Sequence, residues 1–412
     1  MSQIESGWGA PSSARYEQLA ETFRPLFTRI RAGAIARELE RQPPLEEIEW
    51  LKKSGFTALR LPKSAGGLEA TLPELFNLLI ELGEADSNLV QSLRGHFGFV
   101  ENVLSSSDTA FRQQWFTRIA QGEIVGPAWS ETGEARQTVF STQIKRSGDR
   151  WRLDGKKFYT TGSLYSDWIN IGLTDENHKG VSVTVSRTAP GVTVLDDWNG
   201  FGQTLTASGT AIFENVEIPH VDIREDAHFG YAPAFYQLIH LATLAGIGRA
   251  QSGEVASLVA ARTRTYSNGN APRAADDAQI LQVVGRLRSA AYTSGAIVQH
   301  AAQSLQRAYE AQQQNDEQQK THSVAIAELE VSQSLNVVTD LLLNASSTLF
   351  DALGASATLK PLALDRFWRN ARTLSSHNPR IYKDRIVGDF AVNGTLPPEQ
   401  WRIGIADNPQ EK

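Results

Sequence analysis

The chain has 412 residues, of which 41% are hydrophobic and 21% charged, as is ordinary for a globular protein with two or three packed domains. Its formal net charge of −6 offers no basic surface for nucleic acid, and no run approaches the roughly eighteen apolar residues of a membrane span. The start, MSQIESGWGAPSS, lacks the basic and apolar regions of a secretory signal, so we expect a cytoplasmic protein.

Sulfur-bearing residues are almost absent. The sequence has no cysteine, and its single methionine is Met1. Disulfides, thiolate catalysis and cysteine-ligated metals are therefore excluded. Two functional explanations fit: a protein made when sulfur is scarce saves sulfur, and a protein that generates a peroxide avoids oxidisable side chains. The alternative is compositional drift, because Leu and Ile replace Met in a core at small cost.

Residues 1–122 have the pattern of helices. Near the start, apolar side chains recur at spacings of three and four, which places them on one face of a helix. A similar run covers residues 72–82, with Thr71 as its N-cap before Pro73. The residues of the first face are Tyr16, Leu19, Phe23 and Phe27.

Residues 123–230 change to a period of two. The run RWRLDGKKFYTTG alternates and contains Asp154–Gly155, a dipeptide that favours a hairpin turn. Four further short runs follow between turn residues, and together they predict a small antiparallel β domain. These runs are WINIGL, GVSVTVSR, GVTVLDDW and TAIFENVEIP.

Residues 231–412 are helical again in pattern, apart from the polar tract 309–320, which we interpret as a solvated helix end and loop. The order of helices, strands and helices predicts an α+β fold. Three long helices and a shorter one are expected near residues 233–266, 278–314, 322–350 and 360–372.

Four segments in this order resemble the acyl-CoA dehydrogenase superfamily. They are LPKSAGGLEA, DGKKFYTTGSLYSDW, FENVEIP and AGIGRA. The resemblance implies an acyl-CoA dehydrogenase-like fold: an N-terminal helical domain (1–122), a middle antiparallel β domain (123–230), and a C-terminal four-helix bundle with a tail (231–412). It also implies a homotetramer.

The segment DRFWRNARTLSSHNPRIYK, from Asp365 to Lys383, resembles the flavin monooxygenase branch, typified by dibenzothiophene monooxygenase and the sulfur-acquisition oxidoreductases. The dehydrogenases of the superfamily commonly carry a catalytic glutamate about nine residues after the arginine that matches Arg369, where a carboxylate base can remove an α-proton. Here that position is Asn378, beside His377, and Asn cannot accept the proton. Some members supply the base from another helix, so the dehydrogenase alternative stays open.

The branch implies a reduced-flavin (FMNH2)-dependent monooxygenase that uses a flavin C4a-hydroperoxide, formed with O2, to oxygenate a small organosulfur compound in sulfur acquisition or desulfurisation. We find no G-x-G-x-x-G fingerprint, so a separate NAD(P)H-dependent flavin reductase is expected to supply FMNH2. The alternatives are an acyl-CoA dehydrogenase with FAD, an FMNH2-dependent amine or aromatic hydroxylase, and a flavin-free scaffold.

By the same resemblance, His377 lies beside the reactive edge of the flavin and His96 opposite it across the pocket, with Thr161 in the turn after the hairpin as the third catalytic residue. The alternatives are a histidine that complements a helix dipole at position 377 and a satisfied core histidine at position 96. The residues expected to contact the cofactor are Trp129, Ser130, Tyr159, Thr160, Thr161, Gly162, Trp198, Arg264, Arg372 and Asn378.

Arg264 and Arg372 are candidates for the FMN phosphate, because a guanidinium fork binds phosphate through two hydrogen bonds. Arg262 is an alternative to Arg264, and Ser356 stands where the related enzymes are expected to carry a further arginine. Trp198 is expected over the pocket or, alternatively, in the core of the β domain. No metal site is expected, because the remaining histidines, including His178, His220 and His228, lack the spacing of metal ligands.

Overall fold

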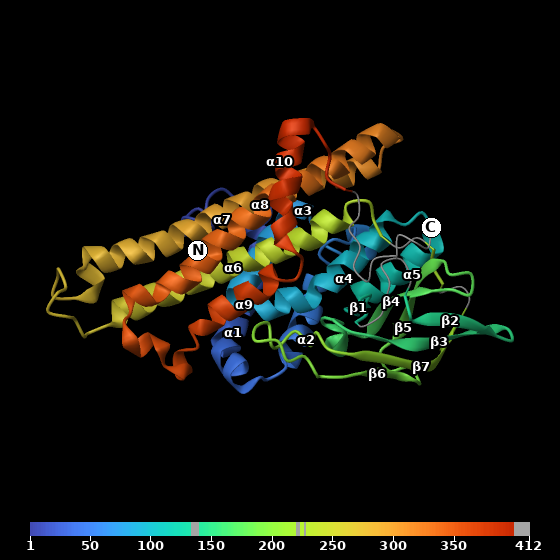
Figure 1. Ribbon diagram of the computed structural model, residues 1–412, viewed down its shortest axis with the longest axis horizontal. Helices are drawn as coiled ribbons and strands as arrows, with labels where there is room; N and C mark the ends of the chain where they lie inside the picture. Colours follow the sequence, from blue (N-terminus) through green and yellow to red (C-terminus); the bar gives the residue numbers. More distant parts are fainter. Residues whose placement is uncertain (133–139, 220–222, 226–227, 399–412) are drawn as a thin grey trace, which may run out of the picture.

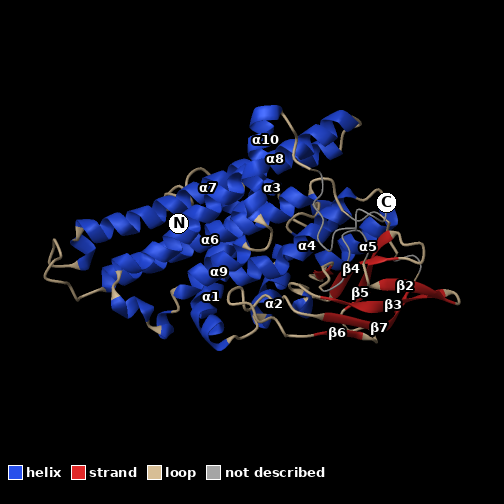
Figure 2. Cartoon of the chain, in the orientation of Figure 1, coloured by secondary structure: helices blue, strands red, loops and turns tan. Residues whose placement is uncertain are grey.

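The computed structural model describes residues 1–132, 140–219, 223–225 and 228–398. A long body of helices carries a small β sheet at one end (Figures 1 and 2). The helices come first and last in the chain and the strands lie between them, which confirms the predicted α+β order. None of the described helices is long and apolar enough to cross a membrane.

Helix α3 begins where the sequence pattern predicts it. Thr71 caps α3, since its side chain accepts the backbone N–H of Glu74 while the Glu74 carboxylate accepts the N–H of Thr71. Asp86 caps the next helix by accepting the N–H of Asn88. The five helices are α1 (Tyr16–Glu40), α2 (Leu45–Lys53), α3 (Leu72–Ala85), α4 (Ser87–Ser105) and α5 (Thr109–Ala120).

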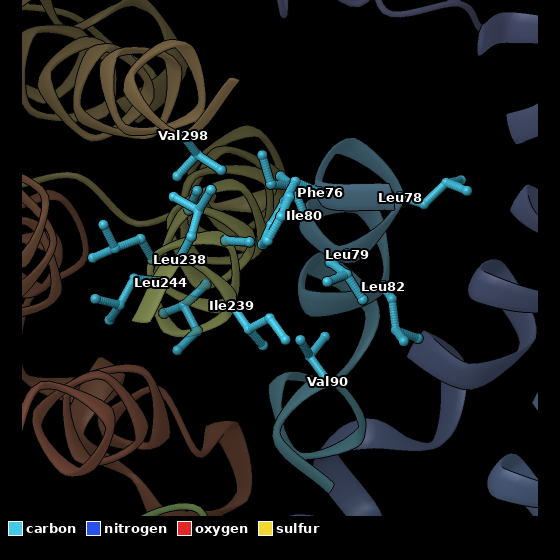
Figure 3. Close-up of a cluster of buried hydrophobic side chains, with 14 of the residues drawn as sticks. Phe76, Leu78, Leu79, Ile80, Leu82, Val90, Leu238, Ile239, Leu244 and Val298 are labelled. Atoms are coloured by element: carbon cyan, nitrogen blue, oxygen red, sulfur yellow. The ribbon is translucent and has the colours of Figure 1, made fainter. Parts of the chain in front are cut away.

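Helix α3 is buried on nearly all sides, and its polar stripe is satisfied by ion pairs of Glu74 with Arg15 and of Glu81 with Arg24. It packs against α6 (Ala232–Ala261), and Figure 3 shows side chains of the two helices meeting in one apolar cluster. Phe76 of α3 meets Phe235 of α6 edge to face, with ring centroids 5.6 Å apart. One hydrophobic core therefore includes residues of both the N-terminal helices and the C-terminal bundle.

The sheet has the order β1-β4-β2-β3-β7-β6, with β5 paired to β4. Most pairs are antiparallel, but β1 runs parallel to β4, so the predicted all-antiparallel domain is wrong in this detail. The strands are β1 (Val125–Ala128), β2 (Gln143–Ser147), β3 (Arg150–Lys157), β4 (Trp168–Thr174), β5 (Gly180–Ser186), β6 (Val192–Val194) and β7 (Ala211–Ile218).

The predicted hairpin turn at Asp154–Gly155 is also wrong. Both residues lie inside β3, where the register with β7 shifts between Leu153 and Gly155. The turn between β2 and β3 instead contains Gly148, which has φ 63°. Position 155 is a glycine because Thr142 packs closely against the backbone there: a Cβ would lie 2.5 Å from the Thr142 hydroxyl.

The C-terminal helices agree with the predicted three long and one shorter segments. The polar tract 309–320 covers the end of α7, a short connection and the start of α8, as predicted. A further helix, α10 (Lys383–Asn393), was not expected. The bundle helices are α6, α7 (Ala278–Gln312), α8 (Glu317–Thr348) and α9 (Asp365–Ser375).

Helix α9 runs antiparallel to α6. Arg366 at its start pairs with Glu254 in the second half of α6, whereas Asn378 just beyond its end donates a hydrogen bond to Gln237 near the start of α6. This arrangement brings His377 and the first turns of α6 together.

Candidate functional site

The turn after β3 is fixed between a loop and a helix. Thr160 donates through its hydroxyl and its backbone N–H to Gly209 O, and the Thr161 hydroxyl lies 2.8 Å from that of Ser208. Gly162 has φ 80°, and a Cβ on it would lie 2.0 Å from the carbonyl oxygen of Ser92 in α4. Only glycine meets both demands, so this position holds the turn against α4.

The loop that follows β6 connects this turn to the helices. Trp198 donates through Nε1 to Gln203 O at 3.0 Å. Gln203 in turn binds both α9 and α4, because its backbone N–H donates to Asn370 and its side chain donates to Ser87. Trp198 is partly exposed and lies outside the hydrophobic core of the β domain, so the core alternative for this residue does not hold.

Aromatic side chains remain exposed beside the turn. Tyr159 has φ 59° and is 51% exposed, with its ring 6.1 Å from that of Trp198. Farther along the same loop, Phe201 stacks on Trp368 of α9 with ring centroids 6.0 Å apart. Exposed aromatic groups next to hydroxyl and backbone N–H groups fit a planar, polar-edged ring system such as a flavin.

His377 follows the end of α9 and contacts α6. Its Nδ1 lies 3.1 Å from Asn378 Oδ1, and Asn378 Nδ2 donates to Gln237 at 2.6 Å. Its ring lies 4.4 Å from that of His240, centroid to centroid. Solvent reaches His377, but desolvation by the protein around it lowers the pKa to about 3, and the nearby positive charge of Arg94 acts in the same direction. The imidazole is therefore neutral near pH 7.

Two residues of this cluster, Arg94 and His240, were missed by the sequence reasoning. Arg94 donates through Nε to the backbone oxygen of Tyr236 at 3.2 Å. His240 is 1% exposed, and among the described residues neither of its ring nitrogens has a hydrogen-bond partner. A signal for Arg94 was present, since it is the only charged residue in α4 before Glu101.

The predicted position of His96 across from His377 differs from the structure. His96 Nε2 donates to Thr57 O at 2.9 Å, and Nδ1 accepts the backbone N–H of Val125 at 3.2 Å. Residues two apart on a helix point about 200° away from each other, so Arg94 rather than His96 is directed toward the end of α9. His96 matches the alternative of a satisfied core histidine, and burial lowers its pKa to about 4.

The structure does not bring Trp129 to the turn. Its Nε1 donates to Asn170 at 2.9 Å and its ring lies 4.5 Å from that of His228, on the sheet itself. Ser130 does lie beside the turn, because its backbone oxygen accepts the N–H of Phe158. Arg372, in the last turn of α9, donates to Ser375 and is close to His377 in the chain.

Arg264 lies elsewhere. It is exposed at the far end of α6, where it lines a cavity of about 460 Å³ together with Arg262, Tyr266 and Gly354. At a rise of about 1.5 Å per residue, Gln237 and Arg262 are about 38 Å apart along α6. Within one chain, Arg264 and His377 therefore do not reach the same small cofactor.

No acidic side chain of the described residues is among the groups that shift the pKa of His377. On α6, Glu254 is paired with Arg366 and lies about 20 Å from His240 along the helix axis. The described residues also include no group of three or more histidine, aspartate or glutamate side chains that could hold a metal ion. Imidazole, amide and guanidinium groups thus make up the polar side of the site.

Two family models match the chain: acyl-CoA dehydrogenase, N-terminal domain, over residues 13–123 and acyl-CoA dehydrogenase, C-terminal domain, over residues 238–379. The chain belongs to the acyl-CoA dehydrogenase family. In this family member, the end of α9 presents His377 and Asn378 to α6 in place of a carboxylate.

Curated relatives of this acyl-CoA dehydrogenase family member include monooxygenases. The chain is 26% identical to a probable FMNH2-dependent monooxygenase, SfnC, of Pseudomonas putida, over 91% of this chain and 94% of the relative. It is 25% identical to a dibenzothiophene monooxygenase of Rhodococcus erythropolis, over 91% of this chain and 93% of the relative. The structure of the methanesulfinate monooxygenase MsuC from Pseudomonas fluorescens has a TM-score of 0.83 at 26% identity, covering 92% and 98%.

Proposed function

We propose that the chain is an FMNH2-dependent monooxygenase that oxygenates a small organosulfur compound. One observation carries the proposal: a neutral imidazole, His377, follows α9, the helix that binds the loop beside the turn rich in hydroxyl and aromatic groups, and no acidic side chain of the described residues pairs with it. The names of the similar proteins support it, since they include an FMNH2-dependent monooxygenase and enzymes of dibenzothiophene and methanesulfinate. The near absence of sulfur from the sequence is consistent with a role in sulfur acquisition.

The residues of the turn are suited to hold FMN. Thr161 would supply its hydroxyl and its backbone N–H to the polar edge of the ring, Gly162 fixes the turn by donating its own N–H to Thr206 O, and Ser130 lies beside them. Tyr159 and Trp198 would cover its flat surface. Reduced FMN supplies two electrons for the reduction of O2, and the protein's part is to hold the ring, exclude water and control protons.

His377 is the proposed proton carrier. Asn378 donates to Gln237, which leaves Asn378 Oδ1 as the acceptor that faces His377 Nδ1. This orientation assigns the proton of the neutral imidazole to Nδ1, so Nε2 is free to take up a proton and return it. The guanidinium of Arg94 nearby favours negative charge that develops next to His377.

The proposal includes a separate NAD(P)H-dependent flavin reductase, a cytoplasmic location and a homotetramer. The distance between Arg264 and His377 supports assembly, because the two residues are too far apart to serve one FMN in a single subunit. In the proposed tetramer, Arg262 and Arg264 of one subunit bind the phosphate of the FMN whose ring contacts another subunit.

The dehydrogenase alternative is disfavoured by Asn378 and by the distance of Glu254 from His240. The decisive experiment loads the protein with FMNH2 under anaerobic conditions, admits O2 and measures oxygenated product from a panel of organosulfur compounds. Product that requires FMNH2 is expected. Bleaching of bound FAD by an acyl-CoA, without O2 and without any oxygenated product, would contradict the proposal.

A further inference from the structure

Arg94 has a positive charge that no acidic side chain of the described chain neutralises. Its Nε donates to Tyr236 O, and its guanidinium carbon lies 4.6 Å from the centre of the Tyr236 ring, but it forms no ion pair with any described residue. By contrast, Arg37 pairs with Glu47 and Asp86 in the same N-terminal domain. Arg94 therefore presents two free terminal nitrogens in a fixed orientation, which is the geometry that binds an anion.

His240 gives a second, independent indication of a missing ligand. It is buried in α6, and neither of its nitrogens has a partner among the described residues. Buried polar groups in folded proteins are almost always hydrogen-bonded, so a fully unpartnered imidazole points to a ligand that supplies the partner. Tyr236, which holds Arg94, and His240 are one helical turn apart. The two residues therefore lie on the same face of α6.

We infer that Arg94 and His240 bind the anionic head group of the substrate beside His377, and that this substrate is an alkanesulfinate; the inference rests on the proposed function. The guanidinium of Arg94 would hold two sulfinate oxygens through its terminal nitrogens. His240, whose ring lies 4.4 Å from that of His377, would donate from within the protein. None of these contacts would serve a neutral sulfide or thiophene, which has no charged oxygen.

The location of this anion site suits the reaction. Ser92, which lies two residues before Arg94 in α4, contacts Gly162 of the turn that is proposed to hold the flavin ring. The carboxamide of Asn378 fixes His377 at the other side of the cluster. Ser92 and Arg94 are about 3 Å apart along the axis of α4, although their side chains point to different sides of the helix. An anion held by Arg94 would thus lie beside the proposed proton carrier.

A sulfinate also has the required electrons. Its sulfur keeps a lone pair, so the sulfur forms the new bond to one atom of O2 and becomes a sulfonate, while the O–O bond breaks. FMNH2 gives up two electrons and two protons, and the second oxygen atom leaves as water. The balance is RSO2⁻ + O2 + FMNH2 → RSO3⁻ + FMN + H2O. A sulfonate has no lone pair on sulfur, so it should bind to Arg94 and His240 without being oxidised there.

The test compares three compounds of equal chain length: an alkanesulfinate, the corresponding methyl sulfoxide and the corresponding sulfonate. The sulfinate and the sulfoxide both have a lone pair on sulfur but differ in charge. Arg94→Gln is expected to lower kcat/KM for the sulfinate by about 10- to 100-fold, mainly through KM, because it removes charge-assisted hydrogen bonds. Turnover of the sulfoxide should change by less than about twofold, and Arg94→Lys should restore part of the sulfinate activity.

Binding of the sulfonate gives a readout that does not depend on turnover. By calorimetry, it should bind the wild-type protein, with and without FMN, and should bind Arg94→Gln at least about tenfold more weakly. Arg286→Gln, which removes an exposed arginine of α7, is the matched control and should bind like the wild type. Equal loss of sulfinate and sulfoxide turnover in Arg94→Gln, or no binding of the sulfonate, overturns the inference while the monooxygenase stands. Sulfonate binding without FMNH2-dependent oxygenation of any compound would instead defeat the proposed function.

Discussion

The rings of His240 and His377 lie 4.4 Å apart, with His240 in the first third of α6 and His377 just beyond the end of α9. Desolvation lowers the pKa of both side chains, and the charge of Arg94 lowers both further. The site thus contains two neutral imidazoles and a guanidinium that has no acidic partner among the described residues. Such a site accepts negative charge. The antiparallel packing of α9 on α6 is what creates this site.

Replacement of His377 by alanine should separate oxygen use from product formation. The loss of a proton carrier beside developing charge is expected to reduce product per FMNH2 by about 10- to 100-fold, with hydrogen peroxide released instead. Folding and FMN affinity should not change, because His377 is accessible to solvent and its side chain bonds to its neighbour Asn378 rather than to a distant element. Product yield and peroxide are measured in single turnovers, with the exposed His322→Ala as control. A wild-type yield in His377→Ala would rule out the assigned role.

Gly162→Ala should weaken FMN binding. The added Cβ would lie 2.0 Å from Ser92 O at a backbone φ of 80°, so the turn must move away from α4. We expect at least about a tenfold increase in the Kd for FMN together with a loss of about 2 kcal/mol or more in unfolding free energy.

Gly148→Ala is the matched control for this substitution. Gly148 also has a positive φ, 63°, but a Cβ added to it in the β2–β3 turn would meet no described atom within 4 Å. The substitution should destabilise the protein by only about 1 kcal/mol and leave FMN titrations unchanged. Equal effects of the two alanines on FMN binding would show that the turn at Gly162 does not contact the cofactor.

Acid should destabilise the folded chain through its buried histidines, and His96 is the clearest case. Its pKa is about 4 in the folded protein against an ordinary value of 6.5. As the pH falls below 6.5 the unfolded chain gains a proton that the folded chain does not take up until about pH 4. The stabilisation is therefore complete above pH 6.5 and declines between these two values, by at most about 3 kcal/mol.

Urea unfolding at pH 8, 6.5 and 5 measures this effect. His96→Asn should lower the unfolding free energy at pH 8, because Thr57 O and the Val125 N–H lose their partner. The unfolding free energy of this variant should nevertheless depend less on pH than that of the wild type. A pH dependence as steep as that of the wild type would mean that other groups account for the acid sensitivity.

Thr71→Ala should remove the N-cap of α3. The Glu74 N–H would lose its acceptor, which is expected to lower the unfolding free energy by about 1 kcal/mol. Thr71→Ser keeps the hydroxyl and should remain close to the wild type. Both are compared by denaturant titration, and equal stabilities of the alanine and serine variants would contradict the assigned cap.

The local patterns of the sequence determined the order of helices and strands, the cap at Thr71 and the long helices of the bundle, because spacing and capping act over a few neighbouring residues. The same local reasoning failed at Asp154–Gly155, where the pairing of β3 with β7 prevails over the turn preference of the dipeptide. It also did not predict α10.

The site needed the tertiary structure. The side of α4 that faces α9 depends on how the helices pack, and the sequence alone does not determine it. The sequence therefore pointed to His96. In the structure it is Arg94 that faces α9, and both nitrogens of His96 form hydrogen bonds with the backbone. His240 stands in an apolar stretch of α6, and only the packing of α9 brings His377 against it. The sequence by itself therefore determined the elements and the family resemblance. Only the fold decided which charged groups meet, because contacts between distant segments depend on the packing of whole helices.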